Sequence, residues 1–198
     1  RGMSSAASDV YKRQELEEII VTAQKRAESL QDVPISMSAL SGSTIKDNGI
    51  HSFQDLSGYV PNLEIAENAV NTIITMRGIG IGSNQSFEQS VGIYVDGVHF
   101  GKSRQVRSGL FDVEQVEVLR GPQGILFGKN TLAGAINVTT ASANVGDEFS
   151  GGIDVSQESY NGQIVDAHIA GSVTDNLALR FAIRAVSYTH LRAHETDY

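Results

Sequence analysis

The chain contains 198 residues, which is enough for one domain of roughly 150 residues with a remainder. Hydrophobic residues make up 40% of it and charged residues 19%, and there are 20 glycines; this composition excludes disordered, collagen-like and coiled-coil proteins and is typical of a loop-rich β or α+β chain. The formal net charge of −8 would repel a phosphate backbone, so nucleic acid is not an expected partner. Without cysteine, disulfides and thiolate metal sites are excluded, and no metal or cofactor is predicted.

The two ends of the chain differ from its middle. Residues 1–14 and 187–198 show no strand or helix periodicity, and both resemble translated adapter sequence found at the edges of assembled reading frames. We therefore expect both stretches to be artefacts that flank a genuine fragment. His190 and His194 are spaced like two ligands on one helix face, but we do not expect them to bind a metal. No window is apolar enough for a transmembrane helix, and the first residues lack the apolar centre of a secretory signal.

Short apolar runs alternate with clusters of Gly, Asn, Asp and Ser as far as residue 143, which predicts a compact mixed domain of short strands and helices. A strand is expected over 33–40, followed by a helical turn over 43–48 that ends at Gly49. Ser52 is expected to begin a short helix that buries Phe53 and Leu56. Further strands are expected over 72–77, 91–95, 114–119 and 134–140, with a hairpin turn at Asp96-Gly97.

From Ser150 the pattern changes to a longer two-residue alternation. Leu177, Leu179, Phe181 and Ile183 share one face of a strand, and the intervening Arg180 and Arg184 share the other. Turns at residues 160–162 and 174–176 would give about three antiparallel strands of roughly 10 residues, the length of a tilted membrane strand. A soluble meander covering a core would show the same alternation, so the pattern leaves both interpretations open.

The most distinctive sequence motif lies between residues 117 and 138. It reads Glu117-Val118-Leu119-Arg120-Gly121-Pro122-Gln123-Gly124-Ile125-Leu126-Phe127-Gly128-Lys129-Asn130 and continues into Ala133-Gly134-Ala135-Ile136-Asn137-Val138. Glycines 121, 124, 128 and 134 predict positive φ angles and close backbone approach in a packed loop. This stretch resembles the signature of the plug domain of TonB-dependent outer-membrane receptors. Three earlier pieces occur in the order typical of that family: Val33-Pro34-Ile35, Arg77-Gly78 and Tyr94-Val95-Asp96-Gly97.

The resemblance covers residues 15 to about 186 and implies an α+β fold of two parts. A compact plug domain of short strands and helices would occupy 27–143, preceded by a TonB box and linker over 15–26. Residues 144–186 would be the first three or so antiparallel strands of a truncated 22-stranded transmembrane β-barrel. The location implied is the bacterial outer membrane, with the plug inside the barrel lumen in contact with a wall embedded in lipid.

The segment Glu17-Glu18-Ile19-Ile20-Val21-Thr22-Ala23 resembles the TonB box. It is β-prone and has no packing partner nearby in sequence, so we expect a strand that another chain completes by β-augmentation; an ordinary edge strand of the plug is the alternative. The resemblance implies that the periplasmic energy transducer TonB contacts this segment and pulls on it, so that the plug shifts or partly unfolds. The residues implied in TonB contact are Glu18, Ile19, Ile20, Val21, Thr22 and Ala23.

Arg77 and Arg120 each stand beside a glycine at the end of an expected strand. A guanidinium can make bidentate hydrogen bonds to a carboxylate. The resemblance implies that Arg77, Glu117 and Arg120 latch the plug to the barrel wall, with wall carboxylates as partners of the two arginines.

The resemblance also implies that outward-facing plug loops form the floor of a ligand site. Amides, aromatic rings and cations there would suit an anionic, oxygen-rich ligand such as a ferric siderophore. The residues concerned are Ser83, Asn84, Gln85, Phe87, Phe100, Lys102 and Arg104.

Enzyme motifs are not found. The run Gly124 to Lys129 fails the phosphate-loop pattern at two positions, and residues 78–83 miss the dinucleotide fingerprint. Asp96, Asp112 and Glu114 form no convincing catalytic pair, because they lack a histidine or metal cluster beside them. We therefore expect a TonB-dependent import receptor driven by the proton gradient, and not an enzyme. The alternative is a soluble periplasmic or secreted ligand-binding module; a receptor that also signals through an extra amino-terminal domain is a third possibility.

Overall fold

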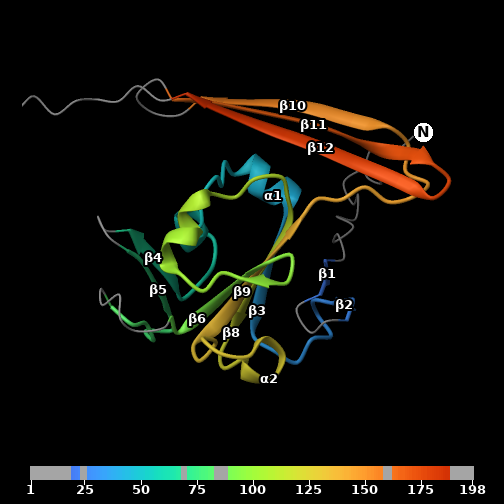
Figure 1. Cartoon of the computed structure of the whole chain (residues 1–198). Helices are drawn as coiled ribbons and strands as arrows, with labels where there is room; N and C mark the ends of the chain where they lie inside the picture. The colour runs from blue at the N-terminus through green and yellow to red at the C-terminus, as the bar shows by residue number, and fades with distance from the viewer. Residues whose placement is uncertain (1–18, 23–25, 68–70, 83–88, 158–161, 188–198) are drawn as a thin grey trace, which may run out of the picture.

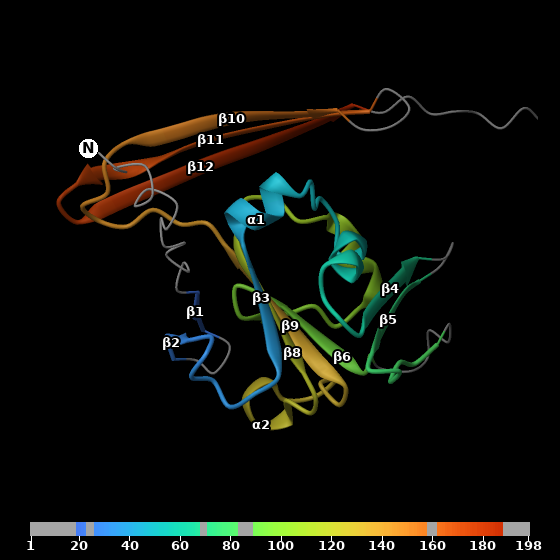
Figure 2. The same ribbon diagram turned by 180° about the vertical axis from the view of Figure 1, so that it is seen from behind.

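The computed structural model describes residues 19–22, 26–67, 71–82, 89–157 and 162–187. A mixed α+β domain, called here the mixed domain, extends to about residue 143, and a separate three-stranded sheet follows it (Figure 1). The three strands lie across one end of the mixed domain, beside α1, while α2 lies at the opposite end, as both views show (Figures 1 and 2). None of the helices among the described residues is long and apolar enough to cross a membrane.

A five-stranded sheet forms the centre of the mixed domain. Its order is β3-β8-β9-β6-β7, and its bounds are Met37–Ser41 (β3), Val91–Val95 (β6), Val98–His99 (β7), Val113–Arg120 (β8) and Gly134–Thr140 (β9). Only β6 and β9 run parallel; the other neighbours are antiparallel. The strand β8 therefore lies between β3 and β9 and is hydrogen-bonded along both edges.

Among the described residues, two short hairpin-like pairs and four short helices surround this sheet. The pairs are β1 (Ile20–Val21) with β2 (Glu28–Ser29), and β4 (Leu63–Glu67) with β5 (Thr72–Met76). The helices are α1 (Gly42–Asp47), the 3-10 helices η1 (Gln54–Gly58) and η2 (Ser103–Ser108), and α2 (Gly124–Phe127).

Local side-chain chemistry accounts for several of these elements. The Ser41 hydroxyl caps α1 by accepting from the Thr44 N–H at 3.3 Å, and the chain leaves the helix through Gly49 at φ 63°. Asp96 and Gly97 have φ angles of 48° and 78°, which is the geometry of the tight turn expected between β6 and β7.

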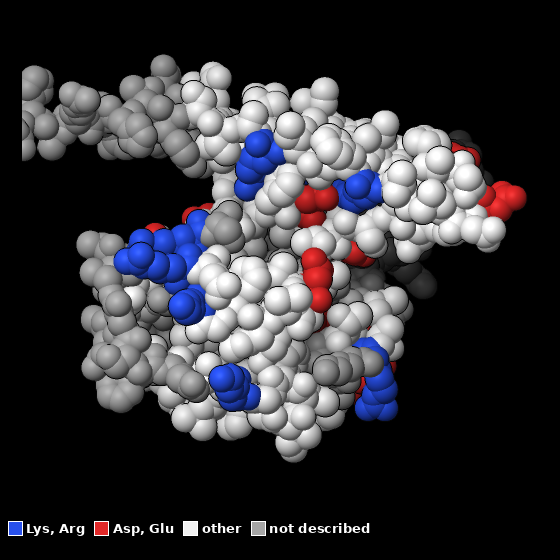
Figure 3. Space-filling model, in the orientation of Figure 1, with Lys and Arg blue, Asp and Glu red and all other residues white. Residues whose placement is uncertain are grey.

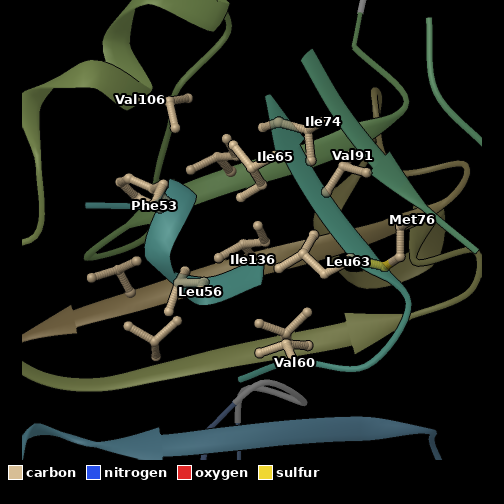
Figure 4. Packing of buried hydrophobic residues seen from close by; sticks show 14 of the residues in the cluster. Phe53, Leu56, Val60, Leu63, Ile65, Ile74, Met76, Val91, Val106 and Ile136 are labelled. Atoms are coloured by element: carbon tan, nitrogen blue, oxygen red, sulfur yellow. The ribbon is translucent and has the colours of Figure 1, made fainter. Parts of the chain in front are cut away.

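The hydrophobic core lies on one face of the central sheet. Alternate residues of β8, Val116 and Val118, are fully buried there, and η1 contributes Leu56. Figure 4 shows how side chains from η1, β4, β5 and β9 meet around Ile136. The opposite face of β8 carries Glu117 and Leu119, and it is covered by a smaller cluster and by the β1–β2 pair.

The last three strands form an antiparallel sheet with two different faces. They are β10 (Ser150–Gln157), β11 (Gln163–Thr174) and β12 (Leu177–Ser187), and the turn between β11 and β12 lies where the sequence predicts it. One face is apolar and open: Ile153 is 75% exposed and Phe181 66%. The face toward the mixed domain carries Arg180 and Arg184.

Several expectations need correction. The strand expected over 33–40 begins only at Met37, because its neighbour β8 ends at Arg120, whose N–H makes the last bond of the ladder to the Ser36 carbonyl. Gly121 and Gly128 have the expected positive φ angles, and Gly134 lies where a Cβ would be 2.3 Å from other atoms. Gly124 shows neither property, since it is the first residue of α2 and has open space beside it.

Candidate functional site

The segment expected to wait for a partner strand is already paired within the chain. Residues Ile20–Val21 form β1 against β2, and the Ile19 carbonyl accepts from the Leu30 N–H at 2.9 Å. Val21 is only 1% exposed, whereas Ile20 is 55% exposed. The expectation of an unpaired strand is therefore wrong. Its partner strand lies seven to nine residues further along the chain. The short apolar run at residues 19–21 gives no information about that partner. Glu18 and Ala23 lie outside the described residues.

Side chains of β8 contact the same segment from its other edge. The Gln115 Nε2 donates to the Ile20 carbonyl at 3.0 Å. The Thr22 N–H donates to Glu117 Oε1 at 2.5 Å, and the Asn137 Nδ2 donates to Glu117 Oε2 at 2.9 Å. Glu117 is completely buried, and its carboxylate is held by donors from Thr22, the residue after β1, and from Asn137 on β9. This position is inside the mixed domain, on the face covered by β1.

Arg77 and Arg120 meet at a cavity of about 640 Å³ near the start of β3. The Arg77 Nη2 and the Arg120 Nε both donate to the Ser36 hydroxyl, at 2.9 and 3.1 Å. Arg120 also donates to the Ser38 hydroxyl and the Met37 carbonyl. Burial lowers the pKa of Arg120, and the positive charge of Arg77 adds to this effect. Within the described residues neither guanidinium is paired with a carboxylate, so the cavity is positively charged and suited to an anionic group.

A second contact joins the three-stranded sheet to the mixed domain. Arg180 on β12 donates twice to the Asp112 carboxylate, from Nε at 2.7 Å and from Nη2 at 2.5 Å. Each of these side chains is 18% exposed, and the hydrogen bonds from Arg180 hold the pKa of Asp112 below its usual range. Arg184 donates to the Leu110 carbonyl at 2.8 Å and lies over the Phe111 ring.

These contacts fasten the loop of residues 110–112 to β12, and we call the arrangement the β12 clamp. Arg184 is fixed for this role by Asp166, its cross-strand neighbour on β11, at 2.7 Å. Charged side chains of both signs gather along the seam between the sheet and the mixed domain (Figure 3). Lys46 and Asp154 add an exposed ion pair across the same seam at 2.9 Å.

The residues expected to face a ligand are only partly described. Phe100 packs partly against the main core, and Lys102 and Arg104 are exposed at the start of η2. The other predicted residues, Ser83, Asn84, Gln85 and Phe87, lie outside the described residues. The structure shows both cations exposed, and the contact of these residues with a ligand stays a prediction.

Residues 29–135 match the family model of the TonB-dependent receptor plug domain. The chain belongs to the TonB-dependent receptor family. Its mixed domain is the plug, and β10–β12 are the start of the barrel, as the resemblance implied. The likeness decides between the two interpretations of the alternating strands, and it confirms the outer membrane as the location.

Named relatives show the same relationship. The chain is 32% identical over 167 residues to the pesticin receptor of Yersinia pestis, covering 79% of this chain and 24% of that protein. It is 28% identical over 196 residues to an iron-regulated outer membrane virulence protein of Vibrio cholerae, covering 89% and 28%. The crystal structure of the ferric yersiniabactin uptake receptor FyuA from Yersinia pestis superposes with a TM-score of 0.64 at 31% identity, covering 71% and 22%. The chain thus spans about a quarter of the length of these relatives, and the two from Yersinia pestis are named as receptors.

Two groups of contacts were not predicted from the sequence. The alternation of β12 placed Arg180 and Arg184 on one polar face. Nothing in the sequence indicated that their hydrogen-bond acceptors would be Asp112 and the Leu110 carbonyl. The role of Gln115 was also missed, although its position two residues before Glu117 puts both side chains on one face of β8.

Proposed function

We propose that this chain supplies the gating plug and the first wall strands of a receptor that imports a scarce ligand across the outer membrane. The observation that carries the proposal is the β12 clamp. A plug is fastened by charged side chains to the polar face of strands whose other face is apolar and open, as expected for a domain seated inside a membrane barrel.

The ligand that we propose is a ferric siderophore. Support comes from the named relatives, one of which is an uptake receptor for ferric yersiniabactin. The exposed cations Lys102 and Arg104, near the start of η2, suit an anionic, oxygen-rich ligand.

Energy is proposed to enter through residues 19–22, which would form a strand with TonB. Backbone groups of Ile20 and Thr22 turn toward β8, on the edge of β1 opposite β2, so this is the edge that a TonB strand would use. To pair at this edge, TonB would displace only the side chains of Gln115 and Glu117. Pairing at the other edge would require β1 to separate from β2.

The latch predicted at Arg77 and Arg120 is proposed to form with carboxylates of the barrel wall. The support is the positively charged cavity at Ser36, into which a carboxylate fits between the two guanidinium groups. In a complete receptor, Arg77→Lys would keep the charge and lose the bidentate geometry. We expect this variant to raise ion conductance through the receptor in a planar bilayer, and an unchanged conductance would count against the latch.

Binding to the carboxy-terminal domain of TonB tests the energy-coupling proposal. The 198-residue chain in detergent is titrated by calorimetry and crosslinked in parallel, together with Ile20→Pro and Ile20→Ala. Proline removes the backbone donor that a strand partner needs, whereas alanine keeps it, so only the proline variant should abolish binding. Equal binding by both variants, or no contact with either chain in the crosslinking experiment, would refute strand pairing at this segment.

A further inference from the structure

We infer that Glu117 is the positioning residue that keeps the TonB-contacting segment docked on the plug, and that TonB must displace its carboxylate to gain the segment. This inference deepens the proposed function, since it concerns how access to residues 19–22 is controlled. Backbone groups of this segment are already hydrogen-bonded within the chain.

Backbone groups along residues 19–22 turn alternately to two sides. The Ile19 carbonyl faces β2, where it accepts from Leu30. The Ile20 carbonyl and the Thr22 N–H face β8. The carbonyl accepts from the Gln115 side chain, and the N–H donates to the Glu117 carboxylate. Groups that point to the same edge of a strand recur every second residue, so these two lie side by side on the edge opposite β2.

Gln115 and Glu117 therefore occupy the place of a neighbouring strand. They stand two residues apart on the same face of β8, and this spacing matches that of Ile20 in β1 and Thr22 just after it. One side chain donates and the other accepts, as the backbone of a paired strand would. A strand from TonB needs the same edge, so docking and TonB pairing exclude each other.

Glu117 contributes more to this docking than Gln115. Its carboxylate is fully buried and accepts from the Thr22 N–H, the Thr22 hydroxyl and the Asn137 amide, whereas Gln115 makes a neutral hydrogen bond. Hydrogen bonds to a charged group are stronger than neutral ones. Asn137 lies directly opposite Glu117 in the β8–β9 register and fixes the second carboxylate oxygen, so the first remains aimed at Thr22.

The carboxylate also makes undocking reversible. When the segment leaves, the buried carboxylate of Glu117 loses the hydrogen bond from Thr22. The unpaired charge raises the free energy of the undocked state and so favours redocking. A glutamine at this position has one acceptor oxygen for the two donors, Thr22 and Asn137, and its amide nitrogen would face one of them. Glu117→Gln thus weakens docking with little change in volume.

Hydrogen–deuterium exchange without TonB tests the role of Glu117 directly. The 198-residue chain in detergent is compared with Glu117→Gln and with the matched control Gln115→Ala, which removes the neutral bond to the same segment. We expect exchange of the Thr22 amide to rise about tenfold or more in Glu117→Gln and by less in Gln115→Ala, while peptides from β9 keep their protection. Unchanged exchange at Thr22, or an equal rise at Thr22 and throughout β9, would overturn the inference.

A second variant covers the case in which Glu117→Gln does not fold. Asn137→Leu leaves Glu117 in place but removes the amide donor that holds its second carboxylate oxygen. Exchange of the Thr22 amide should rise in this variant also, and protection equal to that of the unaltered chain would overturn the inference.

Titration with the TonB domain separates this inference from the proposed function. If both hold, Glu117→Gln binds TonB more tightly than the unaltered chain, an effect that loss of stability alone would not produce. Faster exchange at Thr22 without any TonB binding would support the role of Glu117 in docking and refute strand pairing with TonB. Faster exchange combined with weaker TonB binding would overturn the claim that docking competes with TonB.

Discussion

The β12 clamp predicts a measurable energetic coupling between Asp112 and Arg180. The most informative change is Asp112→Asn, because Asp112 has φ 50° and asparagine tolerates that left-handed conformation well. Asparagine keeps the shape of the side chain and one acceptor oxygen, but it loses the charge and turns an amide toward the guanidinium. The backbone of the 110–112 loop is therefore preserved while one charge-assisted bond is lost and the other weakened.

The expected magnitude follows from the geometry. Arg180 makes two hydrogen bonds to Asp112, at 2.7 and 2.5 Å, and each side chain is 18% exposed. Hydrogen bonds to charged groups contribute about 1.5–3 kcal/mol each, so the change should cost about 2 kcal/mol. Lys46 and Asp154 supply a matched control across the same seam, since their side chains are 55% and 51% exposed. An exposed pair of this kind is worth about 0–1 kcal/mol.

Double-mutant cycles measure both couplings. The first cycle combines Asp112→Asn with Arg180→Gln, and the second combines Asp154→Asn with Lys46→Gln. The free energy of unfolding is obtained from urea titrations of the 198-residue chain in detergent, followed by far-UV circular dichroism. A coupling between Asp112 and Arg180 no larger than that between Lys46 and Asp154 would refute the assignment of the clamp as the main attachment.

Three further outcomes are expected. The pKa of Asp112 is lowered in the folded chain, so its contribution to stability is complete above its unfolded pKa of about 3.9 and is lost as the pH falls through the lowered value. Between pH 7 and pH 2.5 the urea midpoint of the unaltered chain should therefore fall by an amount that Asp112→Asn does not show. Gly134→Ala should prevent folding or strongly lower the urea midpoint, because its Cβ would come within 2.3 Å of neighbouring atoms, whereas Gly124→Ala has open space and should change the midpoint little; similar midpoints would contradict the packing described. The apolar face around Phe181 should cause aggregation in water and dispersion in detergent, so a monodisperse chain in plain buffer by light scattering would argue against membrane strands.

Elements with local chemical signals were predicted well. The β6–β7 hairpin follows from Asp96-Gly97, whose left-handed conformations require those residue types. The short helix after Ser52 buries Phe53 and Leu56 as expected, although it is a 3-10 helix. In each case neighbouring residues determine the backbone, so a single sequence is sufficient.

Contacts between distant residues were predicted less well. The expected plug-to-wall ion pairs had arginines on the plug, but the pair observed at β12 has the opposite polarity, with the acid on the plug. Periodicity shows that Arg180 points away from the apolar face, but it carries no information about which acid meets it 68 residues earlier in the chain. The docking of residues 19–22 was missed for the same reason, because Gln115 and Glu117 lie 95 residues away.

One strand connects the three sites. The β12 clamp holds Asp112, immediately before β8; Glu117 on β8 holds residues 19–22; and Arg120 at the end of β8 lines the positively charged cavity. Because β8 is hydrogen-bonded to β3 on one edge and to β9 on the other, it cannot move relative to both neighbours without breaking these ladders. Release of residues 19–22 is therefore achieved at lower cost by exchanging the side-chain contacts of β8 than by shifting the strand. A pull on the segment would break those contacts first, while the β12 clamp holds the beginning of β8 against the barrel.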